Sequence, residues 1–281
     1  MKLVVDPAEL LRVLDNARAE GKTVGVVPTM GALHAGHLSL VDLARANGAD
    51  FLVLTVFVNP TQFNQASDLA AYPRTLDEDM RLARARGVDV VFAPDVSAMY
   101  PAGFSTFVDE STLSARWEGE HRPGHFRGVA TVCTKLLSLM APAKAVFGEK
   151  DFQQLAVIRR LATDLNLRVE VLAAPTEREP DGLAMSSRNR RLSPADRARA
   201  QRISVALGKA TAAFRAGERD AERLRAMVSG ELTSAVDAID YVAVANPSTL
   251  APLEGAVTEA VVLVAVHVGG VRLIDNIRLG S

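Results

Sequence analysis

The stretch Pro28-Thr29-Met30-Gly31-Ala32-Leu33-His34-Ala35-Gly36-His37 places two histidines where a strand gives way to a helix. Residues 22–27 form an apolar run typical of a buried parallel strand, and residues 36–47 carry apolar side chains at helical spacing. The histidines therefore belong to a helix N-terminus. Backbone N–H groups and the positive end of the helix dipole favour an anion there, and phosphate is the obvious candidate.

Gly31 and Gly36 give this stretch the freedom for a tight turn and for close approach of the backbone to a phosphate chain. Two alternatives stay open for the histidines. A His-x-x-His pair can bind zinc, although no Glu follows in metalloprotease spacing and Cys133 is the single cysteine. Either histidine can also be a structural residue whose hydrogen bonds are satisfied within the fold.

Composition sets the frame for the whole chain. A length of 281 residues favours two domains, and 48% hydrophobic residues suffice for a sizeable core. Because 32 Lys and Arg balance 33 Asp and Glu, we expect no nucleic-acid partner. With neither a signal-peptide core nor a run of membrane-spanning length, we expect a soluble cytoplasmic protein without a membrane partner. Because Cys133 is the single cysteine, the chain cannot form an internal disulfide, and we expect this thiol to be packed in the core.

Strands and helices alternate through the first part of the chain, which favours a doubly wound α/β domain with a parallel, Rossmann-like sheet over residues 1–176. Asp6 and Pro7 signal a helix that runs to about Glu20. The pattern then predicts strands at 22–27, 51–58, 88–92, 144–147 and 168–172, and helices at 36–47, 75–86, 128–139 and 153–165.

A smaller α+β domain is predicted for residues 177–281, because residues 176–191 are polar and rich in turn formers. Ser193 and Pro194 then start a helix that we expect to reach about Ala216. Short strands follow at 241–244, 260–267 and 272–277, with a Gly269-Gly270 turn before the last.

Polar segments follow three of the predicted strands, at 59–63, at 148–154 and in the stretch that ends at 185–189. Ligands of such sheets bind at the carboxyl ends of the strands, so we expect these segments to line one crevice. Lys150 and Arg188 would neutralise phosphates, and Gln62 and Gln154 would hold a neutral or carboxylate-bearing substrate. Taken singly, each of these residues is also explained as solvated surface.

Several blocks of the sequence together carry a family resemblance: 28–40, 57–63, 72–74, 122–129, 147–155, 181–189 and 273–277. Through them the chain resembles the pantothenate synthetases, which are pantoate–β-alanine ligases of the nucleotidyltransferase superfamily with a His-x-Gly-His signature. The resemblance implies that ATP and pantoate form pantoyl adenylate and pyrophosphate, and that β-alanine then displaces AMP to give pantothenate. It also implies Mg2+ alongside ATP, and a homodimer.

Residue roles follow from the resemblance by position. It implies ATP contacts at Met30, Gly31, Ala32, Leu33, His34, Ala35, Gly36, His37, Gly148, Glu149, Lys150, Asp151, Glu177, Met185, Ser186, Ser187 and Arg188. The catalytic residues implied are His34, His37, Lys150 and Arg188, and His37 is the position usually assigned as proton donor. Gln62 and Gln154 correspond to pantoate contacts, and Gln62 also to the β-alanine contact. The acidic segment 77–79 is the region considered for magnesium, with no ligand assigned.

Three positions depart from the family pattern. Residues 64–67 replace a Gly-Pro type sequence, Ala35 replaces a more usual Glu, and Glu177 stands where an apolar residue usually flanks adenine. We expect the contact at Glu177 to come from its backbone, with the carboxylate in solvent, because burying a charge beside the base is costly.

Two rival functions remain at this stage. Another nucleotidyltransferase would share the two histidines, but would be expected to carry a Lys-Met-Ser-Lys-Ser type loop or an RNA-binding appendage. A nucleotide-binding regulatory protein would bind ATP without releasing pyrophosphate. If the chain is a ligase, its acyl adenylate must be protected from hydrolysis, so we expect the second domain to act as a lid that excludes water.

Overall fold

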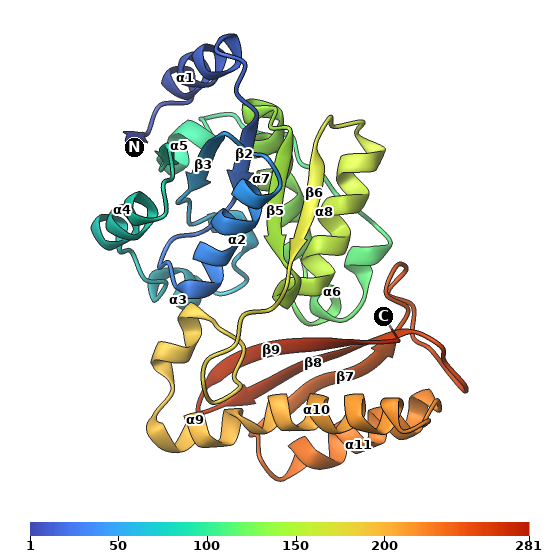
Figure 1. Cartoon of the computed structure of the whole chain (residues 1–281). Helices are drawn as coiled ribbons and strands as arrows, with labels where there is room; N and C mark the ends of the chain where they lie inside the picture. Colours follow the sequence, from blue (N-terminus) through green and yellow to red (C-terminus); the bar gives the residue numbers. More distant parts are fainter. Residues whose placement is uncertain (281) are drawn as a thin grey trace. The chain divides into compact units, whose positions relative to one another are not determined.

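The computed structural model describes residues 1–280, and the chain forms two compact units (Figure 1). Unit 1 comprises Met1–Ser114, Arg122–Glu149 and Gln154–Pro175, and unit 2 comprises Ala115–His121, Lys150–Gln153 and Thr176–Ser281. The predicted domains, 1–176 and 177–281, stay a prediction, because compactness alone does not show that either part folds independently.

Unit 1 is built on a six-stranded sheet in which every pair of neighbours is parallel. In spatial order its strands are β1 (Lys2–Val4), β4 (Val90–Phe92), β3 (Phe51–Thr55), β2 (Val24–Val27), β5 (Lys144–Gly148) and β6 (Glu170–Ala174). The predicted doubly wound sheet is confirmed. The strand order reverses between β2 and β5, and ligands of open parallel sheets bind at the carboxyl ends of the strands at such a point.

The helices of this part of the chain follow the predicted pattern closely. They are α1 (Pro7–Ala19), α2 (Ala35–Ala46), α3 (Ala66–Ala70), α4 (Leu76–Ala85), α5 (Val96–Met99), α7 (His125–Met140) and α8 (Phe152–Asp164), with short 3-10 turns η1 (Pro60–Gln62), η2 (Leu113–Ala115) and η3 (Glu149–Asp151). Asp6 caps α1 by accepting hydrogen bonds from Ala8 N at 3.1 Å and Glu9 N at 3.3 Å. Among the helices that were predicted, only α7 differs noticeably, because it begins three residues before the predicted start. The short helices α3 and α5 were not predicted.

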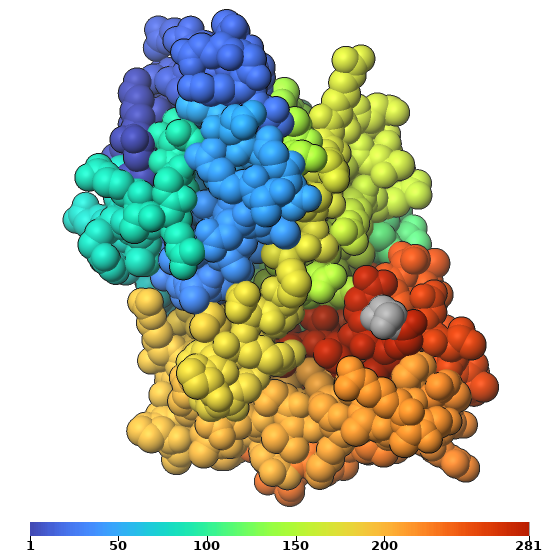
Figure 2. Space-filling model, viewed as in Figure 1, coloured from blue at the N-terminus to red at the C-terminus, as the bar shows by residue number. Residues whose placement is uncertain are grey.

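The core on one side of this sheet is aliphatic. Val41 and Ala44 of α2 pack with Leu54 of β3, Val91 of β4 and Val146 of β5, all fully buried. The opposite side of α2 is exposed at Asp42 and Ala46, and it lies on the face of unit 1 drawn in Figure 2. Packing of its apolar stripe against three strands therefore fixes the position of the helix that follows the two histidines.

Unit 2 contains an antiparallel sheet of β7 (Ala238–Ala245), β8 (Ala260–Val268) and β9 (Val271–Leu279), as Figure 1 shows. Helices α9 (Pro194–Ala200), α10 (Arg202–Arg215) and α11 (Ala221–Thr233) supply the apolar residues that bury one face of it, and α6 (Glu118–His121) and η4 (Ser187–Arg191) complete the unit. Gly269 and Gly270, at φ +58° and +74°, make the two-residue hairpin turn that the sequence predicts.

Several further features of the fold differ from the prediction. The helix expected from Ser193 to Ala216 is interrupted at Gln201, which separates α9 from α10. Strand β1 and helices α6 and α11 were not predicted. Among the helices of residues 1–280, none combines the length and apolar character needed to cross a bilayer.

Candidate functional site

Buried hydrogen bonds hold the loop after β2, one to the end of β3 and one within the loop itself. Thr29 N donates to Thr55 Oγ1 at 3.0 Å, and Gly31 N donates to Thr29 Oγ1 at 3.1 Å. Gly31 and Ala32 are both left-handed, at φ +83° and +51°. Gly31 therefore makes the tight turn that was expected of it, and the close approach to a phosphate stays a prediction. Gly36 lies within the first turn of α2, so the tight turn does not depend on it, contrary to the prediction.

Asp79, on α4, holds this loop from the side. Its Oδ1 accepts a hydrogen bond from Leu33 N at 2.8 Å, and its Oδ2 accepts from Ala32 N at 3.0 Å and from Thr75 Oγ1 at 3.2 Å. The residue is 1% exposed. A Cβ on Gly31 would lie 2.9 Å from Asp79 Oδ2, so the loop passes the carboxylate too closely for a larger residue. Asp79 therefore supports the loop directly and does not stand open to a metal ion.

His34 is the N-cap residue of α2, and His37 lies in the first turn, with ring centroids 4.0 Å apart. Both side chains are partly exposed, so a ligand at the helix N-terminus can reach them. No three His, Cys, Asp or Glu residues within positions 1–280 form a group that could hold a metal ion. The geometry thus offers two imidazoles and a helix N-terminus to one anion.

Gln62 ends the turn after β3, and its amide is oriented by Asn59. Asn59 Nδ2 donates to Gln62 Oε1 and to Gly128 O, both at 3.1 Å, while Asn59 Oδ1 accepts from Tyr100 Oη at 2.8 Å. Since a backbone carbonyl only accepts, these bonds fix the orientation of both amides. Burial raises the pKa of Tyr100, which keeps its hydroxyl as the donor. Gln62 is left to present its NH2 group, whose Nε2 lies 3.0 Å from Met30 Sδ.

The main chain at Gln62 is held equally firmly by the start of α7. Gln62 O accepts from His125 Nδ1 at 2.9 Å and from Arg122 Nη2 at 3.2 Å. A Cβ on Gly128 would lie 2.4 Å from Thr61 O, so the helix and the turn are in backbone contact. Gln62 is consequently placed by its main chain and by its side chain, and unit 1 brings it next to the predicted nucleotide loop at Met30.

Other predicted residues belong to unit 2. Lys150 is partly buried, with its Nζ 3.9 Å from Asp151 Oδ1, and its carbonyl accepts a hydrogen bond from Asn276 Nδ2 at 2.9 Å. Ser186 caps η4 by accepting from Arg188 N at 3.3 Å. Met185, Ser187 and Arg188 are partly exposed, as are Gly148 and Glu149 of unit 1.

Two further expectations concern single side chains. Glu177 is exposed, so its carboxylate lies in solvent as expected. Its main-chain carbonyl accepts a hydrogen bond from Met185 N at 2.9 Å. Cys133 is buried in α7, and burial raises the pKa of its thiol to about 12. It is a packed thiol, as predicted. Gln154, at the start of α8, is partly exposed.

Sequence reasoning missed four residues that hold the site: Asp79 and Tyr100, which lie outside the matched segments, and His125 and Asn276, which lie within them but were given no role. Asn59 was quoted only as part of a polar segment. A signal existed for Asp79, since it lies in the acidic segment 77–79, but nothing in the spacing shows that its partners are backbone N–H groups 46 and 47 residues away.

Comparisons with known proteins show the family to which the chain belongs. The chain matches the family model described as Pantoate-beta-alanine ligase over residues 2–278. It is similar to a pantothenate synthetase of Geotalea uraniireducens, at 50% identity over 282 residues that cover 100% of both chains. A pantothenate synthetase of Geobacter sulfurreducens is 47% identical, with 100% of this chain and 99% of that one covered.

Solved structures give the same result. The chain is similar to the crystal structure of pantothenate synthetase from Thermus thermophilus, with a TM-score of 0.93, 45% identity and 99% of each chain covered. The pantoate-β-alanine ligase from Francisella tularensis, solved with Beta-gamma ATP and β-alanine, has a TM-score of 0.81 at 32% identity, covering 99% of this chain and 97% of that one.

The six-stranded parallel sheet and its switch point define a Rossmann-like α/β protein. Within that class, the chain belongs to the pantoate-β-alanine ligase family. The resemblance seen in the sequence is thereby confirmed, and so is the predicted kind of enzyme, an ATP-binding ligase of pantothenate biosynthesis.

Asp79 allows a direct test of the loop. Asp79→Ala leaves two buried N–H groups without an acceptor, which costs roughly 1–3 kcal/mol for each group. We expect urea unfolding to show this loss in the free energy of unfolding. Asp77→Ala is the matched control, because Asp77 lies in the same helical turn but is exposed. Equal losses in the two variants would contradict the role given to Asp79.

Proposed function

We propose that this chain condenses (R)-pantoate with β-alanine in two steps on one enzyme. In the first, an oxygen of the pantoate carboxylate forms a bond to the α-phosphorus of ATP, and pyrophosphate leaves. In the second, the amine of β-alanine forms a bond to the acyl carbon of pantoyl adenylate, the amine loses a proton, and AMP leaves. The products are pantothenate, AMP and pyrophosphate.

The observation that carries the proposal is the position of His34 and His37 at the N-terminus of α2, beside the switch point of the sheet, in a chain of this family. Adenylation needs no base, because pantoate is already ionised at neutral pH. It needs charge neutralisation of the triphosphate and an in-line approach to phosphorus. Imidazole and backbone N–H donors at a helix N-terminus supply the first requirement.

We assign the phosphates to residues 30–37 of unit 1, with His34 and His37 as catalytic groups and His37 as proton donor. For unit 2 we assign Lys150 and Arg188 as the cationic catalytic groups. The remaining contacts proposed for ATP are Gly148, Glu149, Asp151, Glu177, Met185, Ser186 and Ser187. A lysine ammonium binds phosphate oxygens as a point charge, and an arginine guanidinium can bind two of them at once. Both properties support the assignment.

Gln62 and Gln154 are proposed to bind pantoate, and Gln62 to bind β-alanine. The support at Gln62 comes from the fixed orientation of its amide, since Asn59 engages Oε1 and leaves Nε2 as the donor. A carboxylate or hydroxyl oxygen of the substrate is the acceptor that such a donor requires. The structure gives no comparable orientation for Gln154, whose assignment rests on the family resemblance.

Mg2+ is proposed as the companion of ATP. Residues 1–280 do not fit a magnesium site built from protein ligands alone, because no three acidic or imidazole groups converge and Asp79 is engaged by the loop. Mg2+ commonly takes substrate phosphates and waters as its ligands, which is compatible with this donor set. No step is derived through the ion. A homodimer, a cytoplasmic location, and a lid role for residues 177–281 are further proposals that rest on the family resemblance.

The reaction is tested by product analysis. With ATP and Mg2+ present, we expect pantoate to trigger pyrophosphate release and an exchange of labelled pyrophosphate into ATP. Sustained AMP formation is expected only after β-alanine is added. Reactions without pantoate and reactions without β-alanine are the controls. Formation of ADP, or AMP formation that is independent of pantoate, would reject the proposed chemistry.

His34, His37 and Lys150 are expected to stabilise charge that develops at the phosphates. Loss of one such donor typically lowers turnover about 100- to 1,000-fold. Alanine at each position should reduce pantoate-dependent pyrophosphate release to that extent while leaving the unfolding transition nearly in place. Lys22→Ala is the control, since Lys22 is an exposed cation just before the amino end of β2. A residue whose alanine variant stays within a few-fold of the parent has been assigned wrongly.

Gln62 is expected to govern pantoate and not ATP. Gln62→Glu keeps the shape of the side chain but replaces the donor by a carboxylate, which repels the anionic substrate. Calorimetry should show weaker pantoate binding, with ATP binding little changed. Gln65→Glu introduces the same charge at an exposed position nearby and serves as control. A parallel loss of both ligands in Gln62→Glu would indicate a collapsed site and contradict the assignment.

A further inference from the structure

Residues 273–277, Leu-Ile-Asp-Asn-Ile, form one of the blocks that carry the family resemblance, but the proposed reaction gives them no role. In the structure they lie on β9, an edge strand of the sheet in unit 2. Side chains alternate along a strand, so Leu273, Asp275 and Ile277 share one face and Asn276 lies on the other. Leu273 and Ile277 pack into the apolar core of the unit, which places Asp275 among core residues.

Asp275 anchors the segment that leads to residues 185–188. Its carboxylate accepts from Arg178 Nη1 at 2.7 Å and from Arg178 Nη2 at 3.0 Å, and its side chain is 1% exposed. Arg178 Nη1 also donates to Gly182 O at 3.1 Å, across the turn of a small hairpin. That hairpin is closed by a bridge between Arg178 and Ala184 and by the bond from Met185 N to Glu177 O. The ion pair of Arg178 with the buried carboxylate of Asp275 therefore fixes the backbone that immediately precedes Ser186.

Asn276 anchors Lys150. Its Nδ2 donates to Lys150 O at 2.9 Å, and the residue is 6% exposed. The bond reaches the main chain of Lys150 and not the ammonium group. It therefore fixes where the side chain starts without using the charge that a phosphate would need.

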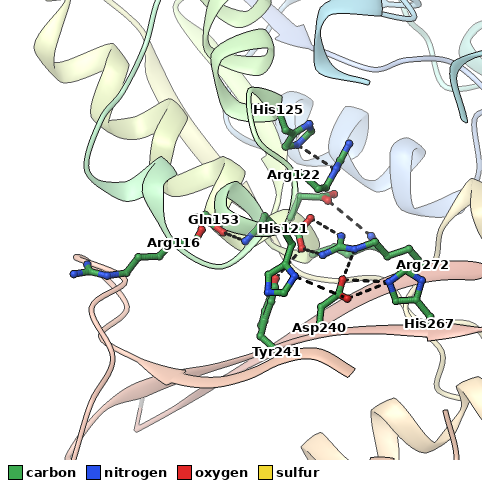
Figure 3. A network of polar contacts seen from close by, with 12 residues as sticks. Arg116, His121, Arg122, His125, Gln153, Asp240, Tyr241, His267 and Arg272 are labelled. Atoms are coloured by element: carbon green, nitrogen blue, oxygen red, sulfur yellow. Dashed lines mark hydrogen bonds and ion pairs between the residues drawn. The ribbon is translucent and has the colours of Figure 1, made fainter. Parts of the chain in front are cut away.

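The same face of β9 holds the residues next to Lys150 through a buried polar cluster, shown in Figure 3. Arg272 donates to both carboxylate oxygens of Glu118, at 2.8 and 2.6 Å. Gln153 Oε1 accepts from Glu118 N at 3.0 Å, and Gln153 Nε2 donates to Arg116 O at 2.7 Å. Strand β9 thus holds both ends of the segment 150–153. Asn276 bonds directly to Lys150, and Arg272 reaches Gln153 through Glu118.

We propose that Asp275 and Asn276 are positioning residues for the nucleotide: two neighbours on β9 hold, on opposite faces of the strand, the two segments of unit 2 that carry Lys150 and Arg188. The inference rests on the proposed function, because that proposal makes these two cations phosphate ligands. Neither Asp275 nor Asn276 touches the nucleotide. Each acts through a hydrogen bond to another residue.

A double-mutant cycle tests the positioning role proposed for Asn276. A displacement of about 1 Å in a catalytic group can cost about 100-fold, so Asn276→Ala should slow pyrophosphate release in a single turnover by about 10- to 100-fold. If Asn276 acts through Lys150, adding Asn276→Ala to Lys150→Ala should cause little further loss. Losses that multiply in the double variant would overturn the inference. Arg215→Ala, at an exposed position on α10 in the same unit, is the control.

The two half-reactions separate positioning from general damage. The attack of β-alanine on isolated pantoyl adenylate involves no triphosphate, so Asn276→Ala should leave its rate within a few-fold of the parent. Equal slowing of both half-reactions would show a merely structural role and reject the inference. If Asn276→Ala does not fold, Asn276→Asp replaces it, because this change removes the donor at nearly constant volume.

The Asp275 arm is tested through its partner. Arg178→Lys keeps the charge beside Asp275 but loses the bidentate bond and the bond to Gly182 O. The loss of pyrophosphate release that Arg178→Lys causes should disappear when Arg188→Ala is already present. If the full loss persists there, the role proposed for Asp275 is wrong. A parent enzyme without pantoate-dependent pyrophosphate release would instead reject the proposed function, so the two failures are distinguishable. A parent that is active together with variants that match it would reject the inference alone.

Discussion

One buried carboxylate, that of Asp79, supports the loop that joins β2 to α2 in unit 1. Gly31 and Ala32 both adopt left-handed conformations, and for a non-glycine residue such strain costs on the order of 1–3 kcal/mol. Asp79 offsets this cost by accepting the N–H groups of Ala32 and Leu33 in a site that water does not reach. The loop is consequently held in one shape before any ligand arrives, which leaves α2 with a fixed N-terminus.

The sheet and its main helices were predictable because their signals are local. A strand buried on both faces needs an apolar side chain at nearly every position, and a capped helix needs only residues close in sequence, as Asp6 and Pro7 illustrate. Strand β1 was missed because two of its three residues are exposed and only Val4 is buried. The break at Gln201 was missed since the flanking sequence is helical on both sides, and tertiary packing decides where such a helix divides.

The candidate site was predictable only in part, for a related reason. The ends of strands and the family pattern indicate His34, His37, Gln62, Lys150 and Arg188. They do not indicate which residues hold them, because those bonds join residues far apart in the chain, such as Asn276 and Lys150. The direction of the Gln62 amide is a second example. It depends on Asn59, and Asn59 depends in turn on the carbonyl of Gly128, which only the folded chain supplies.

Both units use the same physical arrangement: a buried polar side chain bonds to the main chain of a functional segment and leaves the functional group itself for the ligand. Asp79 bonds to the backbone of Ala32 and Leu33, and Asn276 to the backbone of Lys150. A lysine side chain has many rotamers, and their entropy opposes ordering when a phosphate binds. The bond from Asn276 fixes the point at which the side chain of Lys150 starts, and it uses none of the hydrogen bonds of the ammonium group. With the positioning role proposed for Asn276, the remaining conformational cost of ordering Lys150 is limited to its side chain.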